Sequence, residues 1–183
     1  MFVKKATLGK ALLFTTIFTA FFVLINFTEV GVAGLLKITN GASILDFRFG
    51  YSAAEAHDML TTLGEQGRSF YLQKIIPIDF PFPLASMLCY AGWIALVKHT
   101  VPQSKAKNLL IIPFLEMLFN WMENFGIIFM LTGYPDIPVQ AVTMASISGV
   151  LKALFTLGSL FAILVLLTGY LLKTRQRAQE EQI

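Results

Sequence analysis

Charged residues are scarce in this chain. Asp, Glu, Lys and Arg together make up 14% of its 183 residues, whereas soluble domains carry roughly 25%. Hydrophobic residues make up 56%, and the mean hydropathy is +0.69. This composition excludes an ordinary water-soluble domain and indicates a chain whose main solvent is lipid.

Cysteine and histidine are nearly absent. Cys89 stands alone in an apolar run, so neither a disulfide framework, a Cys-x-x-Cys redox pair nor a thiolate metal site can form. His57 and His99 fall outside the apolar stretches, and glutamates without an interior histidine are a poor zinc or di-iron set. We therefore expect no metal and no cofactor.

The chain also lacks linkers, low-complexity tracts and internal repeats, which predicts a single membrane domain over residues 1–183. Its formal net charge of +3 does not indicate nucleic acid as a partner. The basic residues lie in short clusters beside apolar stretches, where they act as topology signals.

Four stretches are apolar over the roughly 20 residues that a helix needs to cross a bilayer, namely 11–28, 78–97, 108–132 and 148–172. The first follows a basic segment, as a signal peptide does, but it is long and has no clear cleavage site, so we expect it to be retained. The predicted fold is all-α, a four-helix transmembrane bundle with a helical extracytoplasmic loop between spans 1 and 2.

Basic residues set the predicted orientation. Nine of them flank the spans on one side: Lys4, Lys5, Lys10, Lys98, Lys105, Lys107, Lys173, Arg175 and Arg177. The opposite side has the long loop 29–77 and the short turn 134–138. Since short cytoplasmic segments are enriched in Lys and Arg, both termini are expected in the cytoplasm.

The long loop contains helix signals. Ser52 and Glu55 have the spacing of a capping box, and Gly64 suits a helix end. These signals predict a helix over 53–63 that lies on the outer mouth of the bundle through an apolar edge of Met59, Leu60 and Leu63.

A second short helix is expected after Gly67, and it carries Arg68. Pro77, Pro81 and Pro83 oppose a regular helix start before about residue 80, which predicts a bend there.

Ionisable and amide side chains recur inside the third apolar stretch. Glu116, Asn120 and Glu123 follow helical spacing on one stripe, with Asn124 at its edge. Charged groups at such depth are costly, at least about 2.5 kcal/mol at a helix centre. Two readings stay open for both glutamates: a functional role, or a structural role as protonated, hydrogen-bonded groups.

Other spans supply matching polar residues. Lys152 of the fourth stretch lies about five residues outward of Glu123, a rise of about 7.5 Å that a lysine side chain can largely bridge. Asn26 and Asp79 come from the first and second stretches, and together these residues predict a polar pocket in the outer half. Interface hydroxyls are expected to act mainly as helix-helix hydrogen bonds: Thr15, Thr19, Thr156 and Ser159.

Several strings resemble an uncharacterised family of bacterial four-span integral membrane proteins: Asp46-Phe47-Arg48-Phe49-Gly50-Tyr51, Gly67-Arg68 with Tyr71, Asp79 with Phe82-Pro83, Glu123-Asn124 and Tyr134-Pro135. The resemblance implies the same topology in a bacterial cytoplasmic (inner) membrane. Asn120 departs from the family, which usually has Asp at that position, and this departure weakens any mechanism that needs two carboxylates there.

The function that we favour from the sequence is binding or modification of a membrane lipid or other amphipathic molecule in the outer-half pocket. Glu123 and Glu116 are the candidate catalytic residues. The candidate ligand-binding residues are Asn26, Arg48, Arg68, Asp79, Asn120, Asn124 and Lys152. Arg48 and Arg68 are expected to pair with Asp46 or Asp79 or to contact an anionic head group, and Lys152 or Arg68 is the expected anion contact. The alternatives are a structural or assembly subunit of a membrane complex, with a homo-oligomer or other membrane proteins as partners, and a proton- or ion-coupled small carrier.

Overall fold

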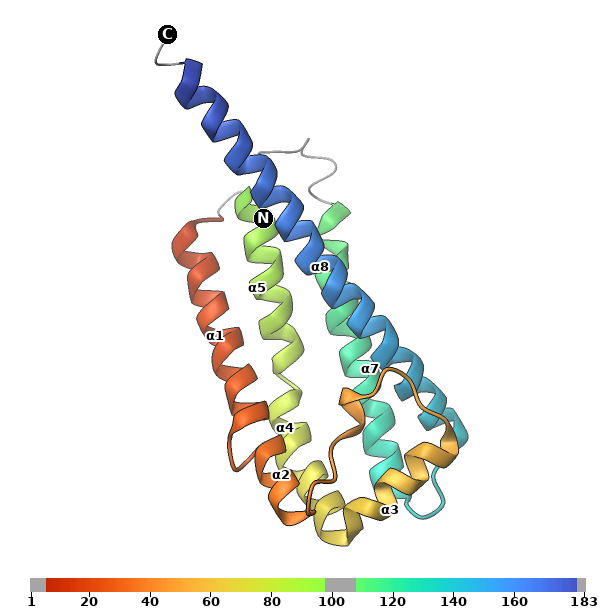
Figure 1. The fold of residues 1–183 in the computed structure, drawn as a ribbon. Helices are drawn as coiled ribbons and strands as arrows, with labels where there is room; N and C mark the ends of the chain where they lie inside the picture. Colours follow the sequence, from red (N-terminus) through yellow and green to blue (C-terminus); the bar gives the residue numbers. More distant parts are fainter. Residues whose placement is uncertain (1–5, 98–107, 181–183) are drawn as a thin grey trace.

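A computed structural model describes residues 6–97 and 108–180, and in that part of the chain every regular element is helical. Four long helices pack side by side in Figure 1: α1 (Leu8–Phe27), α5 (Phe82–Val97), α7 (Ile111–Gly133) and α8 (Val139–Glu180). Both termini lie at one end of this bundle, and the segment that joins α1 to α5 folds over the other end. The basic residues Lys4, Lys5, Lys98, Lys105 and Lys107 lie outside the described residues.

Within residues 6–97 and 108–180, four helical segments are long and apolar enough to cross a membrane: Leu8–Ile38, Ala53–Val97, Ile111–Gly133 and Val139–Gln176. The predicted all-α architecture with four long apolar helices is therefore confirmed, but the expected boundaries differ. The fourth helix starts at Val139, directly after the turn that contains Pro135 and Pro138, and not at 148. Hydropathy marks only the apolar part of a helix, whereas its backbone hydrogen bonds continue into polar sequence.

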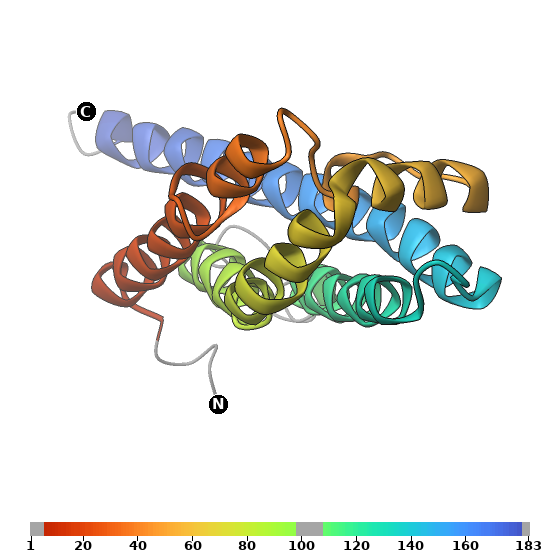
Figure 2. The ribbon, with the colours of Figure 1, turned by 90° about the horizontal axis from the view of Figure 1, so that it is seen from below.

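Between α1 and α5 the chain forms more helix than the sequence predicts. The elements are α2 (Val32–Ile38), a 3-10 turn (Leu45–Phe47), α3 (Ala53–Phe70), a π-helix (Tyr71–Ile75) and α4 (Ile76–Asp79). Figure 2 shows α3 crossing the end of the bundle. Neither α2 nor the π-helix was predicted, because a seven-residue helix and a widened turn leave no periodic signal in the sequence.

The start of α3 follows local sequence rules. The Ser52 hydroxyl accepts a hydrogen bond from the Glu55 amide, and the Glu55 side chain accepts from the Ser52 amide, so the capping box is present. The helix is broken at Gly64, whose φ of +64° favours glycine.

The expected second helix does not start after Gly67, as predicted, but directly after Gly64. Gly67 serves packing: a Cβ there would lie 2.7 Å from Thr39 Cγ2, so only glycine lets α3 approach the end of α2 so closely.

The main apolar core lies at the end of the bundle under this loop. Leu35, Leu45, Leu60 and Ile75 of the loop pack with residues of α7 and α8, and Met59 and Leu63 join the same cluster. The loop is thus part of the folded core.

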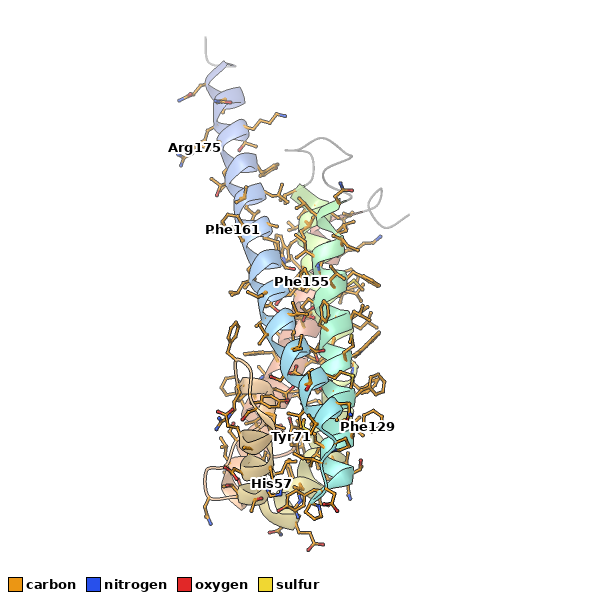
Figure 3. All side chains as sticks on the ribbon, turned by 90° about the vertical axis from the view of Figure 1, so that its right-hand side faces the viewer. His57, Tyr71, Phe129, Phe155, Phe161 and Arg175 are labelled. Atoms are coloured by element: carbon orange, nitrogen blue, oxygen red, sulfur yellow. The ribbon has the colours of Figure 1, made fainter. Side chains whose placement is uncertain are left out.

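The outer surface of the long helices is apolar. Figure 3 shows Phe129 on α7 and Phe161 on α8, which are 55% and 68% exposed, while Arg175 lies where α8 extends past the other helices. A broad exposed apolar surface on otherwise well-packed helices is typical of lipid-facing helices.

Candidate functional site

Three charged side chains from distant segments meet inside the bundle. Lys152 of α8 forms an ion pair with Glu123 Oε2 of α7, and its Nζ lies 3.6 Å from Oδ1 of Asp46 in the loop. The Glu123 side chain is fully buried, and those of Lys152 and Asp46 are mostly buried. Glu123 and Lys152 therefore face each other, as the sequence predicts, and Asp46 is an additional partner of Lys152.

Small residues allow this pair to form. A Cβ on Gly149 would lie 2.5 Å from Glu123 Oε1, so the missing side chain leaves room for the carboxylate beside α8. One turn further, a Cβ on Gly126 would lie 2.7 Å from Ala145 Cβ and 2.8 Å from the Ala141 carbonyl oxygen. Close packing of α7 on α8 at Gly126 and Gly149 thus brings Glu123 within reach of Lys152.

Two tyrosines from the loop segment enclose the same charges. The hydroxyl of fully buried Tyr71, in the π-helix, donates to Asp46 Oδ2. The Tyr51 amide donates to Ser146 Oγ at 2.8 Å, which fixes the loop to α8. Burial raises the pKa of the Tyr51 phenol, and the charges of Glu123 and Asp46 raise it further.

A second polar group lies beside the ion pair. Asn124 Nδ2 donates to Asp79 Oδ2 at 2.7 Å and lies 3.5 Å from Asn120 Oδ1. The structure thus brings Asp79, Asn120 and Asn124 together. The spacing along α7 predicted that the two asparagines lie close to each other, but it could not place Asp79, which lies on α4.

Glu116 lies two turns from Glu123 on α7, and it has a different neighbour. Ser86 Oγ of α5 lies 2.9 Å from Glu116 Oε2. No lysine, arginine or histidine of the described residues forms an ion pair with Glu116, which is 3% exposed. Glu116 is therefore buried with a neutral partner.

A cavity of about 230 Å³ lies beside these groups. Its polar lining comes from Asn26, Asp46, Tyr71, Asp79, Ser86, Tyr90, Glu116, Asn120, Lys152 and Thr156. Its apolar lining comes from Phe18, Phe22, Ile25, Ile44, Phe47, Ile75, Ile76 and Phe82. The lining therefore combines aromatic and aliphatic side chains with polar and charged ones.

Four of the candidate residues do not line this cavity. Glu123 and Asn124 lie behind it and support Lys152 and Asp79. Arg48 is exposed on the loop. The Arg68 guanidinium donates to the Leu60 carbonyl oxygen at 2.8 Å and stacks 3.9 Å from the centre of the Tyr134 ring. Among the described residues the expected arginine-aspartate pairs do not form, because Lys152, Tyr71 and Asn124 occupy the two aspartates.

Sequence reasoning missed Ser86 and Tyr90 as lining residues. They lie four residues apart in the second apolar stretch, and this spacing was the available signal. In the part of the chain that the structure describes, no three His, Cys, Asp or Glu side chains are grouped so as to hold a metal ion.

The fold and the site define a class: in its described residues the protein is all-α, with four candidate membrane spans and a cavity between its helices that has both polar and apolar lining residues. No protein-family model, curated protein or solved structure matches the chain. The resemblance to the bacterial four-span family therefore stays a prediction.

Proposed function

We propose that this chain is a multi-pass protein of a bacterial cytoplasmic membrane whose internal cavity binds a lipid or another amphipathic small molecule. The observation that carries the proposal is the cavity of about 230 Å³ with its mixed apolar and polar lining. Ligand sites combine a largely apolar lining with a few convergent polar groups, and this lining has both.

Membrane insertion is supported by the four apolar helical segments and their exposed apolar surface. The proposed orientation places both termini and the connection between α5 and α7 in the cytoplasm, since the basic residues gather there. The loop that contains α3 then lies on the outer side, together with the cavity wall formed by Ile44, Asp46 and Phe47.

Topology reporters test this orientation. Fusions after Lys105 and after Arg177 are expected to report the cytoplasm, and an insertion near Gly64, which is only partly buried, is expected to report the outside. An outside signal at Lys105 would overturn the whole orientation.

Within the proposed site, Glu116, Asn120 and Lys152 touch the ligand because they line the cavity. Glu123 acts through Lys152, whose ammonium group it holds in place. In the cavity, Phe18 lies 5.4 Å from Phe82 between ring centroids, and these rings offer an apolar surface for a hydrocarbon chain.

Native mass spectrometry of the purified protein, with lipidomics of the co-purified lipids, tests binding in the cavity. Thr156→Phe would fill part of the cavity and is expected to remove the bound molecule. Thr168→Phe is the matched control, because Thr168 lies on the same helix, makes the same type of hydrogen bond to the carbonyl four residues before it, and is exposed. Equal retention of lipid in both variants would show that the cavity is not the binding site.

A further inference from the structure

Two polar atoms that face the cavity have no hydrogen-bond partner. Among the described residues, Glu116 accepts only from Ser86 through Oε2, which leaves Oε1 free. Asn120 accepts from Asn124 through Oδ1, and its Nδ2 group donates to no described residue. Both side chains are 3% exposed and line the cavity. Both atoms therefore face space in which a bound ligand group can supply the missing partner.

Asn120 Nδ2 is a hydrogen-bond donor and Glu116 Oε1 is an acceptor, and the two side chains are neighbours on α7. Glu116 and Asn120 are four residues apart on α7, which places their Cβ atoms about 5–6 Å apart on one face. A single oxygen atom between them can accept from the amide and donate to the carboxyl oxygen, each at about 2.7–3.0 Å.

The charge of the cavity argues against an anionic head group. Three carboxyl side chains line it, Asp46, Asp79 and Glu116, but only one cation does. That cation, Lys152, already lies against Glu123 and Asp46. A phosphate would therefore meet an excess of acidic groups and no free cation among the lining residues.

The amide of Asn120 argues against an amine. An ammonium group has three donors and no acceptor, so it would leave Asn120 Nδ2 without a partner. A hydroxyl group is both donor and acceptor and satisfies both atoms.

The apolar side of the cavity begins next to this polar pair. Ser86, which contacts Glu116, lies one turn from both Phe82 and Tyr90 on α5. Phe18 of α1 stacks on Phe82 at 5.4 Å between ring centroids, and it meets the Tyr90 ring at a tilt at 5.7 Å. Phe22 continues this wall and is itself 42% exposed, so the wall reaches the outer surface of α1.

We propose that the cavity binds a lipid alcohol, a long hydrocarbon chain that ends in a hydroxyl group. The hydroxyl donates to Glu116 Oε1 and accepts from Asn120 Nδ2, and the chain follows Phe82, Phe18 and Phe22 toward the surface of α1. This inference rests on the proposed function and names its ligand class.

Binding of tritiated hexadecan-1-ol to the full chain in phosphatidylcholine nanodiscs tests it, with empty nanodiscs as background. Unlabelled hexadecan-1-ol, hexadecylamine and hexadecyl phosphate then compete, and they differ only in the head group. The alcohol is expected to displace the label at concentrations at least about tenfold lower than the other two, since a site built around a hydroxyl rejects other groups.

The competition separates the two proposals. If no probe binds above background and none protects the protein against heating, the cavity does not bind such amphiphiles and the proposed function fails. If the amine or the phosphate binds as well as the alcohol or better, the cavity keeps its proposed function but the alcohol inference is overturned.

Variants place the hydroxyl at the polar pair. Asn120→Leu and Glu116→Gln are each expected to weaken hexadecan-1-ol binding about tenfold. Ser159→Ala is the control and is expected to bind normally, because Ser159 is a buried hydroxyl that does not line the cavity. Glu116→Gln keeps the shape of the side chain, so it remains informative if Asn120→Leu fails to fold. Unchanged affinity in every folded variant of the pair would overturn the assignment.

Discussion

Two glutamates of α7, Glu123 and Glu116, are buried in different surroundings, which we call the Glu123 level and the Glu116 level. Glu123 is enclosed on all sides, paired with Lys152 and pressed against Gly149. Glu116, two turns away, contacts one serine and faces the cavity. The comparison teaches that a buried carboxyl group can belong to the framework or to a binding site on the same helical stripe, and that the space around it decides which.

The difference in space has a visible cause. At the Glu123 level, glycine on α8 lets α7 and α8 approach closely, and the loop adds Asp46 and Tyr51 over the pair. At the Glu116 level, the cavity lies between Glu116 and aromatic rings of α1 and α5, Phe18, Phe82 and Tyr90, which contact one another.

The largest expected effect comes from removing the cation at the Glu123 level. Lys152→Met would leave Glu123 and Asp46 without their shared partner, and breaking a buried pair costs about 3–5 kcal/mol. Adding Glu123→Gln should restore part of this loss, because it removes one of the two uncompensated charges. The measurement is the free energy of unfolding by SDS titration in mixed micelles.

The matched control is Lys37→Met. Lys37 also pairs with a glutamate, Glu29, but both side chains are about two-thirds exposed or more, at 66% and 71%. Such a pair is worth about 0–1 kcal/mol. If both lysine variants lost the same stability, the Glu123 level would not be the framework that the comparison describes.

A smaller effect is expected where α8 makes room for Glu123. Gly149→Ala would place a Cβ 2.5 Å from Glu123 Oε1 and should cost about 1–3 kcal/mol by overpacking. Gly158→Ala lies on the same helix, and its Cβ would meet Ile112 Cγ2 at an ordinary 3.4 Å. That control should be neutral or stabilising by up to about 1 kcal/mol. Thermal melting of both variants in the same detergent measures whether the melting temperature falls for Gly149→Ala and stays unchanged or rises for Gly158→Ala.

The smallest change in stability is expected at the Glu116 level. Glu116→Gln keeps an oxygen that can accept from Ser86, so the free energy of unfolding should change by less than about 1 kcal/mol. The same SDS titration measures it beside Lys152→Met. A loss as large as that of Lys152→Met would erase the distinction between the two levels.

Much of the helical plan was readable from the sequence. Apolar length predicted the four long helices, the Ser52–Glu55 spacing predicted the start of α3, and the depth count placed Lys152 opposite Glu123. These features depend on periodicity and local chemistry, which act over a few residues. The predicted start residues of α8 and of the helix after Gly64 were wrong, because the true start residues depend on turns and packing.

The candidate site was only partly readable. Glu116, Asn120, Lys152, Asp79 and Asn26 were named from the sequence, and they do line the cavity. Arg48 and Arg68 were also named but lie elsewhere, since nothing in a loop sequence tells which side chain turns inward.

The sequence by itself determined that the described part of the chain has four helices long and apolar enough to cross a membrane, because this follows from the transfer free energy of apolar runs and from helical spacing. Only the tertiary structure decided that Asp46 from a loop joins Glu123 and Lys152, and that Glu116 faces a cavity. These outcomes depend on how closely pairs of helices approach. That distance is set jointly by glycines, rings and loop residues far apart in the chain, so no single segment encodes it.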